Sequence, residues 1–541
     1  MNTIDIKGDE QTFVEIVERT IDIFEDDEIE QVRERAFMDC LLLSSVYIPS
    51  VTQIGPQAFQ RCTLLENISM PNVVTVGNSA FGGCSSLTSI SLPNATYIDL
   101  GAFSGCSSLT DVYMPNVWML GSSVFYNCTS LSSISLPSLT RMSGENIFRG
   151  CSSLTSISLP DISSLGNNTF NGCTSLTDVY IPNVTSLGVN VFYYCTSLVN
   201  VSCQNITSTG NGAFQGCSSL TSISLPGLES ISDSVFRDCT SLEDVSFQNA
   251  TSVNANAFYN CTSLISVSLP NVINVPSGLL SSRTHLKNVN LQSATTFSSQ
   301  PFYNDTSLEE IYLPAAETIG YNAFRGDYNL TSVSCPVLTF IDYYSFADCK
   351  KLTEVNLPML STSGEYLFIN CTSLTDITLQ SLTSANNYIF RKCSNLKSIS
   401  LPSATSVGMY VFDGCTSLTD VSLPNAKTIG NYAFQNCTSL TDVSLPSAKT
   451  IGSYAFFKCT SLTNLTLPSA TQIGEKVFYE CVNLSNVILG NTSQVVSLVS
   501  GDIAYLRLAT VYVPDDLVDD YKSATNWSAM ADKIKGMSEL T

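Results

Sequence analysis

Apolar residues recur along this chain with a fixed period of 22 residues. The phenylalanines at Phe37 and Phe59 begin a series that continues to Phe478, with one extra residue before Phe148. The series has 21 positions, one of them occupied by Leu280, and a leucine follows six residues after every one of them. So regular a repeat indicates one structural unit copied in tandem rather than several independent domains.

Each repeat unit contains a segment that predicts a short strand. In residues 87–93 the order is Leu-Thr-Ser-Ile-Ser-Leu-Pro, in which apolar and small polar residues alternate. The proline has no N–H to donate and therefore ends the strand. Because a unit of this length cannot bury its own apolar side, neighbouring units must stack. The sequence thus predicts an α/β solenoid that is mostly β, with one short parallel strand in each of about 21 turns.

The two ends of the chain depart from this pattern and are predicted to be caps. The segment before Phe37 carries twelve acids and four bases, and apolar residues at helical spacing predict a short helix over residues 10–19. Near the other end, a last strand and two helices are predicted. The expected division is an acidic N-terminal cap or attachment segment over residues 1–36, the solenoid over 37–490 and a C-terminal cap over 491–541. The expected C-terminal elements are a strand with Val511 and Val513, a helix capped by Asp515 that carries Leu517, Val518 and Tyr521, and a helix with Trp527, Met530 and Ile534 that ends near Gly536.

The repeat resembles the BspA-like, or Treponema-type, class of leucine-rich repeats. The stretch SLTSISLPNATYIDLGAFSGCSSL shows the mark of that class, a Leu-Pro strand followed by IG..AF..C, and the resemblance covers about residues 37–490. The resemblance implies a leucine-rich-repeat solenoid, and a role in adhesion or host-surface contact. The two ends are similar to the flanks of such proteins in gut Firmicutes and their prophages, which implies a tail-associated protein.

Eighteen of the 20 cysteines occupy one position, three residues after the repeated phenylalanine. Stacked equivalents point the same way, whereas the two side chains of a disulfide must point at each other. No Cys-x-x-Cys pair suggests a zinc site. We therefore expect buried thiols that fill a narrow slot in the core. In three consecutive units this position holds Arg283, Asp305 and Asp327, which indicates either a decayed repeat or a contact site over residues 276–327.

Charge and composition exclude several functions. The net charge is −22, with 24 Lys and Arg against 46 Asp and Glu, so nucleic acid is a poor partner. No apolar run in the sequence approaches the length that a membrane span needs, so no membrane insertion is expected. The single histidine, His285, leaves no second histidine for a metal site, and no phosphate-binding loop occurs. We expect neither an enzyme nor a cofactor or metal.

A longer rhythm runs through the two outward positions of the predicted strand. Acids at the first position and tyrosines at the second recur at every third unit. Duplication of three-unit blocks would explain this rhythm. Alternatively, the tyrosines stack on a sugar or peptide while the carboxylates accept hydrogen bonds. The candidate ligand-binding residues are Tyr47, Asp111, Tyr113, Asp178, Tyr180, Asp244, Glu310 and Tyr312.

These features predict a non-enzymatic recognition or adhesion protein whose partner is a cell-surface protein or polysaccharide receptor. The start of the sequence does not read as a secretory signal. With the similarity of the ends, this favours a phage or prophage tail-associated receptor-binding protein, located in the virion, whose N-terminal segment contacts tail proteins. The alternative is a secreted or surface-displayed bacterial adhesin that binds host protein or glycan. A ligand-free spacer is a third interpretation, and a homo-oligomer is left open.

Overall fold

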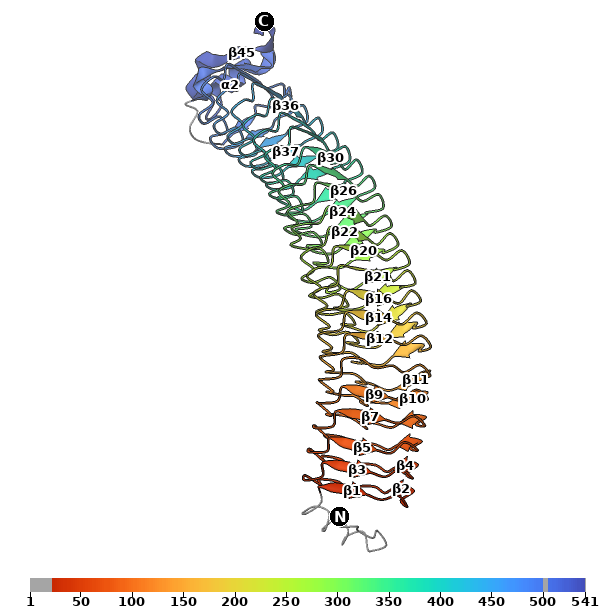
Figure 1. Ribbon diagram of the computed structural model, residues 1–541. Coiled ribbons are helices and arrows are strands. Elements are labelled where there is room, and N and C mark those ends of the chain that lie inside the picture. The colour runs from red at the N-terminus through yellow and green to blue at the C-terminus, as the bar shows by residue number, and fades with distance from the viewer. Residues whose placement is uncertain (1–21, 500–504, 541) are drawn as a thin grey trace. The chain divides into compact units, whose positions relative to one another are not determined.

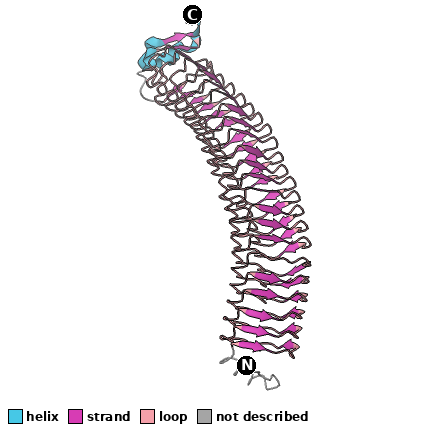
Figure 2. Cartoon of the chain, viewed as in Figure 1, coloured by secondary structure: helices cyan, strands magenta, loops and turns pink. Residues whose placement is uncertain are grey.

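The computed structural model describes residues 22–499 and 505–540 (Figure 1). The chain divides into two compact units, with the boundary between Asn271 and Val272. The helix predicted over residues 10–19 lies outside the described residues. Figure 2 shows that strands and loops make up almost all of both units, and that helix is confined to the C-terminal end. The predicted class, a parallel β-solenoid with little helix, is confirmed.

Most turns of both units contribute two short strands. Three-residue segments such as β7 (Ser89–Ser91) form the first strand, and two-residue segments such as β8 (Tyr97–Ile98) form the second. Partner strands are parallel and come from neighbouring repeats, so that Ile90 lies opposite Val112 and Ile98 opposite Leu120. The first strand is the predicted one. The second strand is an addition that the apolar pattern did not predict.

The first strands lie in register one above the other in each unit. In the N-terminal unit they are β1 (Ile23–Glu25), β3 (Ser45–Tyr47), β5 (Asn67–Ser69), β7, β9 (Asp111–Tyr113), β12 (Ser156–Ser158), β14 (Asp178–Tyr180), β16 (Asn200–Ser202), β18 (Ser222–Ile223), β20 (Asp244–Ser246) and β22 (Ser266–Ser268). In the C-terminal unit they are β24 (Asn288–Asn290), β26 (Glu310–Tyr312), β28 (Ser332–Ser334), β30 (Glu354–Asn356), β32 (Asp376–Thr378), β34 (Ser398–Ser400), β36 (Asp420–Ser422), β38 (Asp442–Ser444), β40 (Asn464–Thr466) and β42 (Asn486–Ile488).

The second strands form a parallel row of their own. In the N-terminal unit they are β2 (Gln31–Val32), β4 (Gln53–Ile54), β6 (Thr75–Val76), β8, β10 (Met119–Gly121), β11 (Arg141–Ser143), β13 (Ser164–Leu165), β15 (Ser186–Leu187), β17 (Ser208–Thr209), β19 (Ser230–Ile231) and β21 (Ser252–Val253). In the C-terminal unit they are β23 (Asn274–Val275), β25 (Thr296–Phe297), β27 (Thr318–Ile319), β29 (Phe340–Ile341), β31 (Thr362–Ser363), β33 (Ser384–Ala385), β35 (Ser406–Val407), β37 (Thr428–Ile429), β39 (Thr450–Ile451), β41 (Gln472–Ile473) and β43 (Ser497–Leu498).

The core of each unit is a column of stacked phenylalanine rings. Phe81 and Phe103 lie with their ring centroids 5.4 Å apart and their planes within 1° of parallel, and both rings are fully buried. Such offset stacking adds about 0.5–1.5 kcal/mol per pair to the burial of the rings. The repeated phenylalanine therefore both fills the core and fixes the distance from one turn to the next.

The described part of the N-terminal segment is built like the turns that follow it. β1 pairs in parallel with β3, and β2 with β4, in the register that the later repeats keep. Phe24 of β1 is buried and contacts Phe37 edge to face, with ring centroids 4.8 Å apart. Residues 22–36 thus extend the solenoid by one turn.

The C-terminal end closes the second unit with strands and short helices. Trp527 donates from its indole Nε1 to the carbonyl oxygen of Val496 at 2.8 Å, and the Val496 N–H donates to the hydroxyl of Tyr521 at 3.0 Å. Both aromatic side chains are buried, so they cover the last turn. The elements are η1 (Leu506–Leu508), β44 (Thr510–Val513), η2 (Asp515–Leu517), α2 (Val518–Ser523), η3 (Ser528–Lys533), β45 (Ile534–Gly536) and η4 (Met537–Glu539).

Two details expected at this end are wrong. Asp515 does not cap the helix, because its Oδ1 accepts hydrogen bonds from the amide and the hydroxyl of Ser538 instead. Ile534 is not helical. It begins β45, which pairs in parallel with β44, because its own backbone is extended, with φ −88° and ψ 123°.

Candidate functional site

The predicted acids and tyrosines lie on the outward side of the first strands. On β9, Asp111 and Tyr113 are exposed on either side of the half-buried Val112. The four predicted tyrosines are 45–60% exposed. The N-terminal unit carries Tyr47 on β3, Asp111 and Tyr113 on β9, Asp178 and Tyr180 on β14, and Asp244 on β20, whereas Glu310 and Tyr312 lie on β26 of the C-terminal unit.

The structure brings Asp111, Asp178 and Glu310 close to the tyrosine of their own strand, and it keeps successive pairs apart, whereas Asp244 has no tyrosine on β20 and Tyr47 no acid on β3. Asp111 and Tyr113 are two residues apart on β9, which corresponds to about 7 Å along a strand. The pair on β14 lies three strands further on, or about 14 Å along the stack. Each acid–tyrosine pair is therefore a separate small surface, and a ligand that contacts two pairs must be extended.

Hydrogen bonds fix two of these carboxylates in place. Asp178 accepts from the hydroxyl of Thr177 at 2.6 Å and from the amide of Asn200 at 2.8 Å, and these two bonds lower the pKa of Asp178. Asp111 accepts from Thr110 Oγ1 at 2.9 Å. Both side chains are exposed, so they present oriented acceptor oxygens to a ligand.

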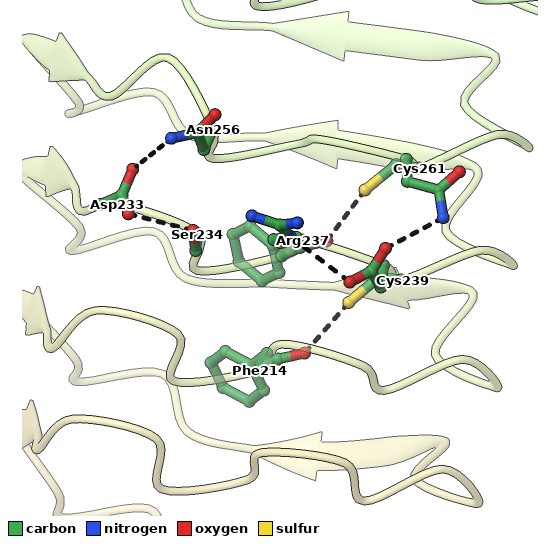
Figure 3. Close-up of polar contacts among 10 residues, drawn as sticks. Phe214, Asp233, Ser234, Arg237, Cys239, Asn256 and Cys261 are labelled. Atoms are coloured by element: carbon green, nitrogen blue, oxygen red, sulfur yellow. Dashed lines mark hydrogen bonds and ion pairs between the residues drawn. The ribbon is translucent and has the colours of Figure 1, made fainter.

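The cysteine column is buried, as predicted, and none of the 20 cysteines forms a disulfide. From Cys62 onward, each thiol of the column has a specific partner, the carbonyl oxygen of the repeated core residue one turn earlier. Figure 3 shows Cys239 donating to Phe214 at 3.1 Å. Burial raises the pKa of Cys151 to about 12. The thiols are hydrogen-bond donors of the core and are not nucleophiles at neutral pH.

Three charged residues replace thiols in the C-terminal unit. Arg283, Asp305 and Asp327 are each at most 3% exposed, and Asp327 Oδ1 accepts from the backbone N–H of Asp305 at 2.7 Å. Burial raises the pKa of Asp305 to about 8, although Arg283 acts in the opposite direction, and burial also raises the pKa of Asp327. Because these side chains lie inside, they belong to the core and cannot themselves contact a partner.

A ladder of six tyrosines was not recognised in the sequence. Neighbouring rings stack with centroids 4.5–5.2 Å apart and planes within 9° of parallel. The six residues lie in left-handed backbone, with φ between 56° and 62°, where bulky residues are rare. A tyrosine two residues before the repeated phenylalanine in six successive units was the available signal. The ladder comprises Tyr344, Tyr366, Tyr388, Tyr410, Tyr432 and Tyr454.

Polar side chains also form ladders on the turns. In Figure 3, Asp233 accepts from the amide of Asn256 at 3.0 Å, one turn further on. The Arg237 guanidinium lies 4.8 Å from the ring centroid of Tyr259. Within residues 22–499 and 505–540, no three His, Cys, Asp or Glu side chains are placed to hold a metal ion. In the same residues no helix has the length and apolar character needed to cross a lipid bilayer.

The repeat geometry defines a leucine-rich-repeat protein. The family described as "BspA type Leucine rich repeat region (6 copies)" matches residues 30–143, 118–228, 207–331, 317–426 and 405–521. The chain belongs to this BspA-type leucine-rich repeat family. No curated protein matches it.

Several solved structures are similar to the chain. A leucine-rich repeat protein from Bacteroides ovatus is 20% identical, with 86% of each chain covered and a TM-score of 0.28. A leucine-rich cell surface protein from Faecalibacterium prausnitzii is 18% identical, with 77% of this chain and 91% of that chain covered and a TM-score of 0.26. A leucine-rich repeat protein from T. pallidum is 27% identical over 36% of this chain and 72% of that chain, with a TM-score of 0.24.

Proposed function

We propose that this protein is a non-enzymatic recognition protein that binds a receptor on a cell surface through the outward side of its first strands. The observation that carries the proposal is the exposure of Tyr47, Tyr113, Tyr180 and Tyr312 at a strand position that is mainly serine or asparagine in the other turns. Tyrosine offers a large contact area and a hydroxyl at a small cost in conformational entropy, which is why it is common in binding surfaces.

The spacing of the pairs favours a ligand with repeated groups. In the N-terminal unit the tyrosines of β3, β9 and β14 are separated by three turns, about 14 Å each. Contacts of this size are individually weak. Two or three of them on one polymer chain, or on a receptor present in many copies, raise the affinity through effective concentration. A surface polysaccharide or a clustered surface protein meets this requirement.

The decisive experiment is to remove the tyrosines together. The triple variant Tyr113→Ser, Tyr180→Ser and Tyr312→Ser should lose most binding to cells that the unaltered protein labels, measured by flow cytometry with fluorescent protein. The matched control replaces three other exposed tyrosines, Tyr194, Tyr321 and Tyr343, which lie outside the first strands. Binding that survives the first triple variant, or is lost equally in the control, contradicts the proposal.

For the biological setting we propose a phage or prophage tail, where the protein would recognise a bacterial surface and its N-terminal segment would contact tail proteins. The support is the similarity of the chain ends to the flanks of repeat proteins in gut Firmicutes and their prophages. The alternative is a bacterial adhesin directed at host protein or glycan. Labelling of gut Firmicutes cells and epithelial cells in parallel separates the two, because a tail protein should label bacteria and an adhesin should label host cells.

A further inference from the structure

One turn of the N-terminal unit is a residue longer than the others, and both rows of strands are interrupted there. The step from Phe125 to Phe148 exceeds the regular repeat by one residue. In the row of second strands, one sheet ends at β11 and the next begins at β13. In the row of first strands, the same turn forms a single bridge at Ser135 in place of a strand. The added residue therefore coincides with a break in the ladder.

The added residue is Gly144, directly after β11. Ser143 holds the register position opposite Gly121, so Gly144 is the surplus residue, and its φ of 143° suits glycine. A Cβ built on Gly144 would lie 1.7 Å from Ser122 Oγ, so no side chain fits there. The surplus residue therefore acts as a bulge after β11, which disrupts the strand ladder locally.

The break leaves hydrogen-bonding groups unused on two facing edges. In regular turns the N–H that precedes the second strand donates to the turn before it, as Thr185 donates to Ser163 at 2.9 Å and Thr140 to Trp118 at 3.1 Å. The equivalent bond from Ser163 to Thr140 does not form, and across the described residues no ladder joins β11 to β13. Peptide donors of β13 and acceptors of β11 are available to a third molecule.

The turns stay joined on both sides of this opening. Asn146 donates its backbone N–H to the carbonyl oxygen of Asn167 at 2.9 Å, and the Asn167 side chain donates to Glu145 Oε1 at 2.6 Å. On the other side Thr155 donates to Ser132 at 3.0 Å. These bonds hold the two turns together beside the gap between β11 and β13.

A hollow of about 390 Å³ occupies the break, within the size range of small-molecule sites. Trp118, one of two tryptophans in the chain, lines it and is 45% exposed. Arg141 of β11 also lines it and makes no ion pair with any described acid. The remaining lining residues are Thr140, Met142, Ile162, Ser163 and Ser164.

We propose that this hollow is a binding site for a single acidic sugar unit, a pyranose that carries a carboxylate. Trp118 stacks on the apolar face of the ring. The Arg141 guanidinium takes the carboxylate with two parallel N–H donors. The peptide groups of β11 and β13, with the hydroxyls of Ser163 and Ser164, pair with ring hydroxyls, which both donate and accept.

Other ligand classes fit less well. A peptide strand needs a longer edge than β11 and β13 offer, because they contain three and two residues. A polyanion is opposed by the net charge of −22, so the acidic sugar should be a terminal unit rather than part of an acidic run. The site does not depend on the tyrosines of the proposed receptor surface, and it is a second, separate contact for a glycan.

Tryptophan fluorescence of the full chain tests the proposal. Trp527 is buried at 1% exposure, so quenching by a bound sugar reports on Trp118. Probes are methyl glucuronide, methyl galacturonide and N-acetylneuraminic acid, beside methyl glucoside, methyl galactoside and an aspartate-containing tetrapeptide. We expect saturable quenching by at least one acidic sugar and at least tenfold weaker binding of its neutral counterpart. Arg141→Gln should remove this preference, and the Tyr113, Tyr180 and Tyr312 triple variant should leave it unchanged.

Deletion of Gly144 is the sharpest variant, because it restores the regular step of the repeat and lets β11 pair with β13. We expect it to abolish quenching while the protein melts at the same or a higher temperature. If the Gly144 deletion variant fails to fold, the Arg141→Gln variant still tests the proposal. The proposal is overturned if no acidic sugar quenches, if neutral sugars bind as well as acidic ones, if the tetrapeptide alone binds, or if Arg141→Gln changes nothing.

Discussion

The buried acids of the C-terminal unit should make the protein less stable as the pH rises from 5 to 8. Asp305 lies in the core, where burial raises its pKa to about 8. In the unfolded chain an aspartate has a pKa near 3.9. Between these two values the folded protein therefore holds a proton that the unfolded chain has lost. Stability from this group is complete below about pH 4 and is lost as the pH rises through 8.

The size of the effect follows from proton linkage. One proton held only by the folded state changes the free energy of unfolding by about 1.4 kcal/mol per pH unit. From pH 5 to pH 8 the loss should approach about 4 kcal/mol, a large part of the roughly 5–15 kcal/mol that ordinarily stabilises a domain. The sign is opposite to that of a salt-bridged surface carboxylate, which stabilises the folded protein as the pH rises.

The assay uses the two tryptophans. In a Trp118→Phe background only Trp527 of the C-terminal unit remains, so its emission during urea unfolding reports on the unit that contains Asp305. The free energy of unfolding is compared between the protein with Asp305 and the Asp305→Asn variant at pH 5, 6, 7 and 8. Asp376→Asn, an exposed change on β32 of the same unit, is the control.

We expect the stability difference between the Asp305 protein and the Asp305→Asn variant to fall steadily with rising pH, while the control difference stays flat. A flat difference for Asp305→Asn would show that Asp305 is ionised in the folded protein, in a pair with Arg283 that outweighs its burial penalty. A difference that rises with pH would refute the reasoning altogether.

Three further outcomes follow from the core and the turns. None of the 20 thiols should react with iodoacetamide at pH 8 in the folded protein, because all of them are buried; mass spectrometry should find full labelling only in urea, and adducts on the folded protein would contradict this. Phe390→Ala should cost about 3–5 kcal/mol in urea unfolding, because its ring stacks on Phe368 and on Phe412; a loss below about 1 kcal/mol would contradict the role given to the column. Tyr410→Asn should be more stable than Tyr410→Ala in the same assay, because asparagine tolerates left-handed backbone; equal or lower stability of Tyr410→Asn would show that the left-handed backbone does not decide stability there.

The sequence was sufficient for the solenoid, because apolar positions such as Leu87 and Ile90 repeat at a fixed step and each has one possible environment. The second strand escaped prediction because a two-residue element such as β8 contains one core residue, Ile98, and is too short to show strand alternation. Ile534 was assigned to a helix from its spacing to Met530. Pairing with β44, which is a tertiary interaction, overrides that local preference.

For the candidate site, the exposure of the tyrosines followed from strand alternation, whereas the hollow could not be foreseen. A single surplus residue, Gly144, is visible in the sequence, but its effect depends on which bonds the neighbouring turns keep. For Asp305 and Asp327, the position in the repeat was the better guide. Their charge suggested the surface, yet their position three residues after the repeated core residue is an interior one in every unit, and position prevailed over residue type.

The hydrogen-bonded cysteines have a consequence for where the protein can work. A cysteine-rich chain is usually expected either to build cross-links outside cells or to remain in a reducing interior. Here every sulfur of the column is buried and shielded from oxidants. From Cys62 onward, each thiol of the column also donates a hydrogen bond to a peptide oxygen of the preceding turn. The folded protein can therefore remain in air-exposed surroundings without scrambled cross-links.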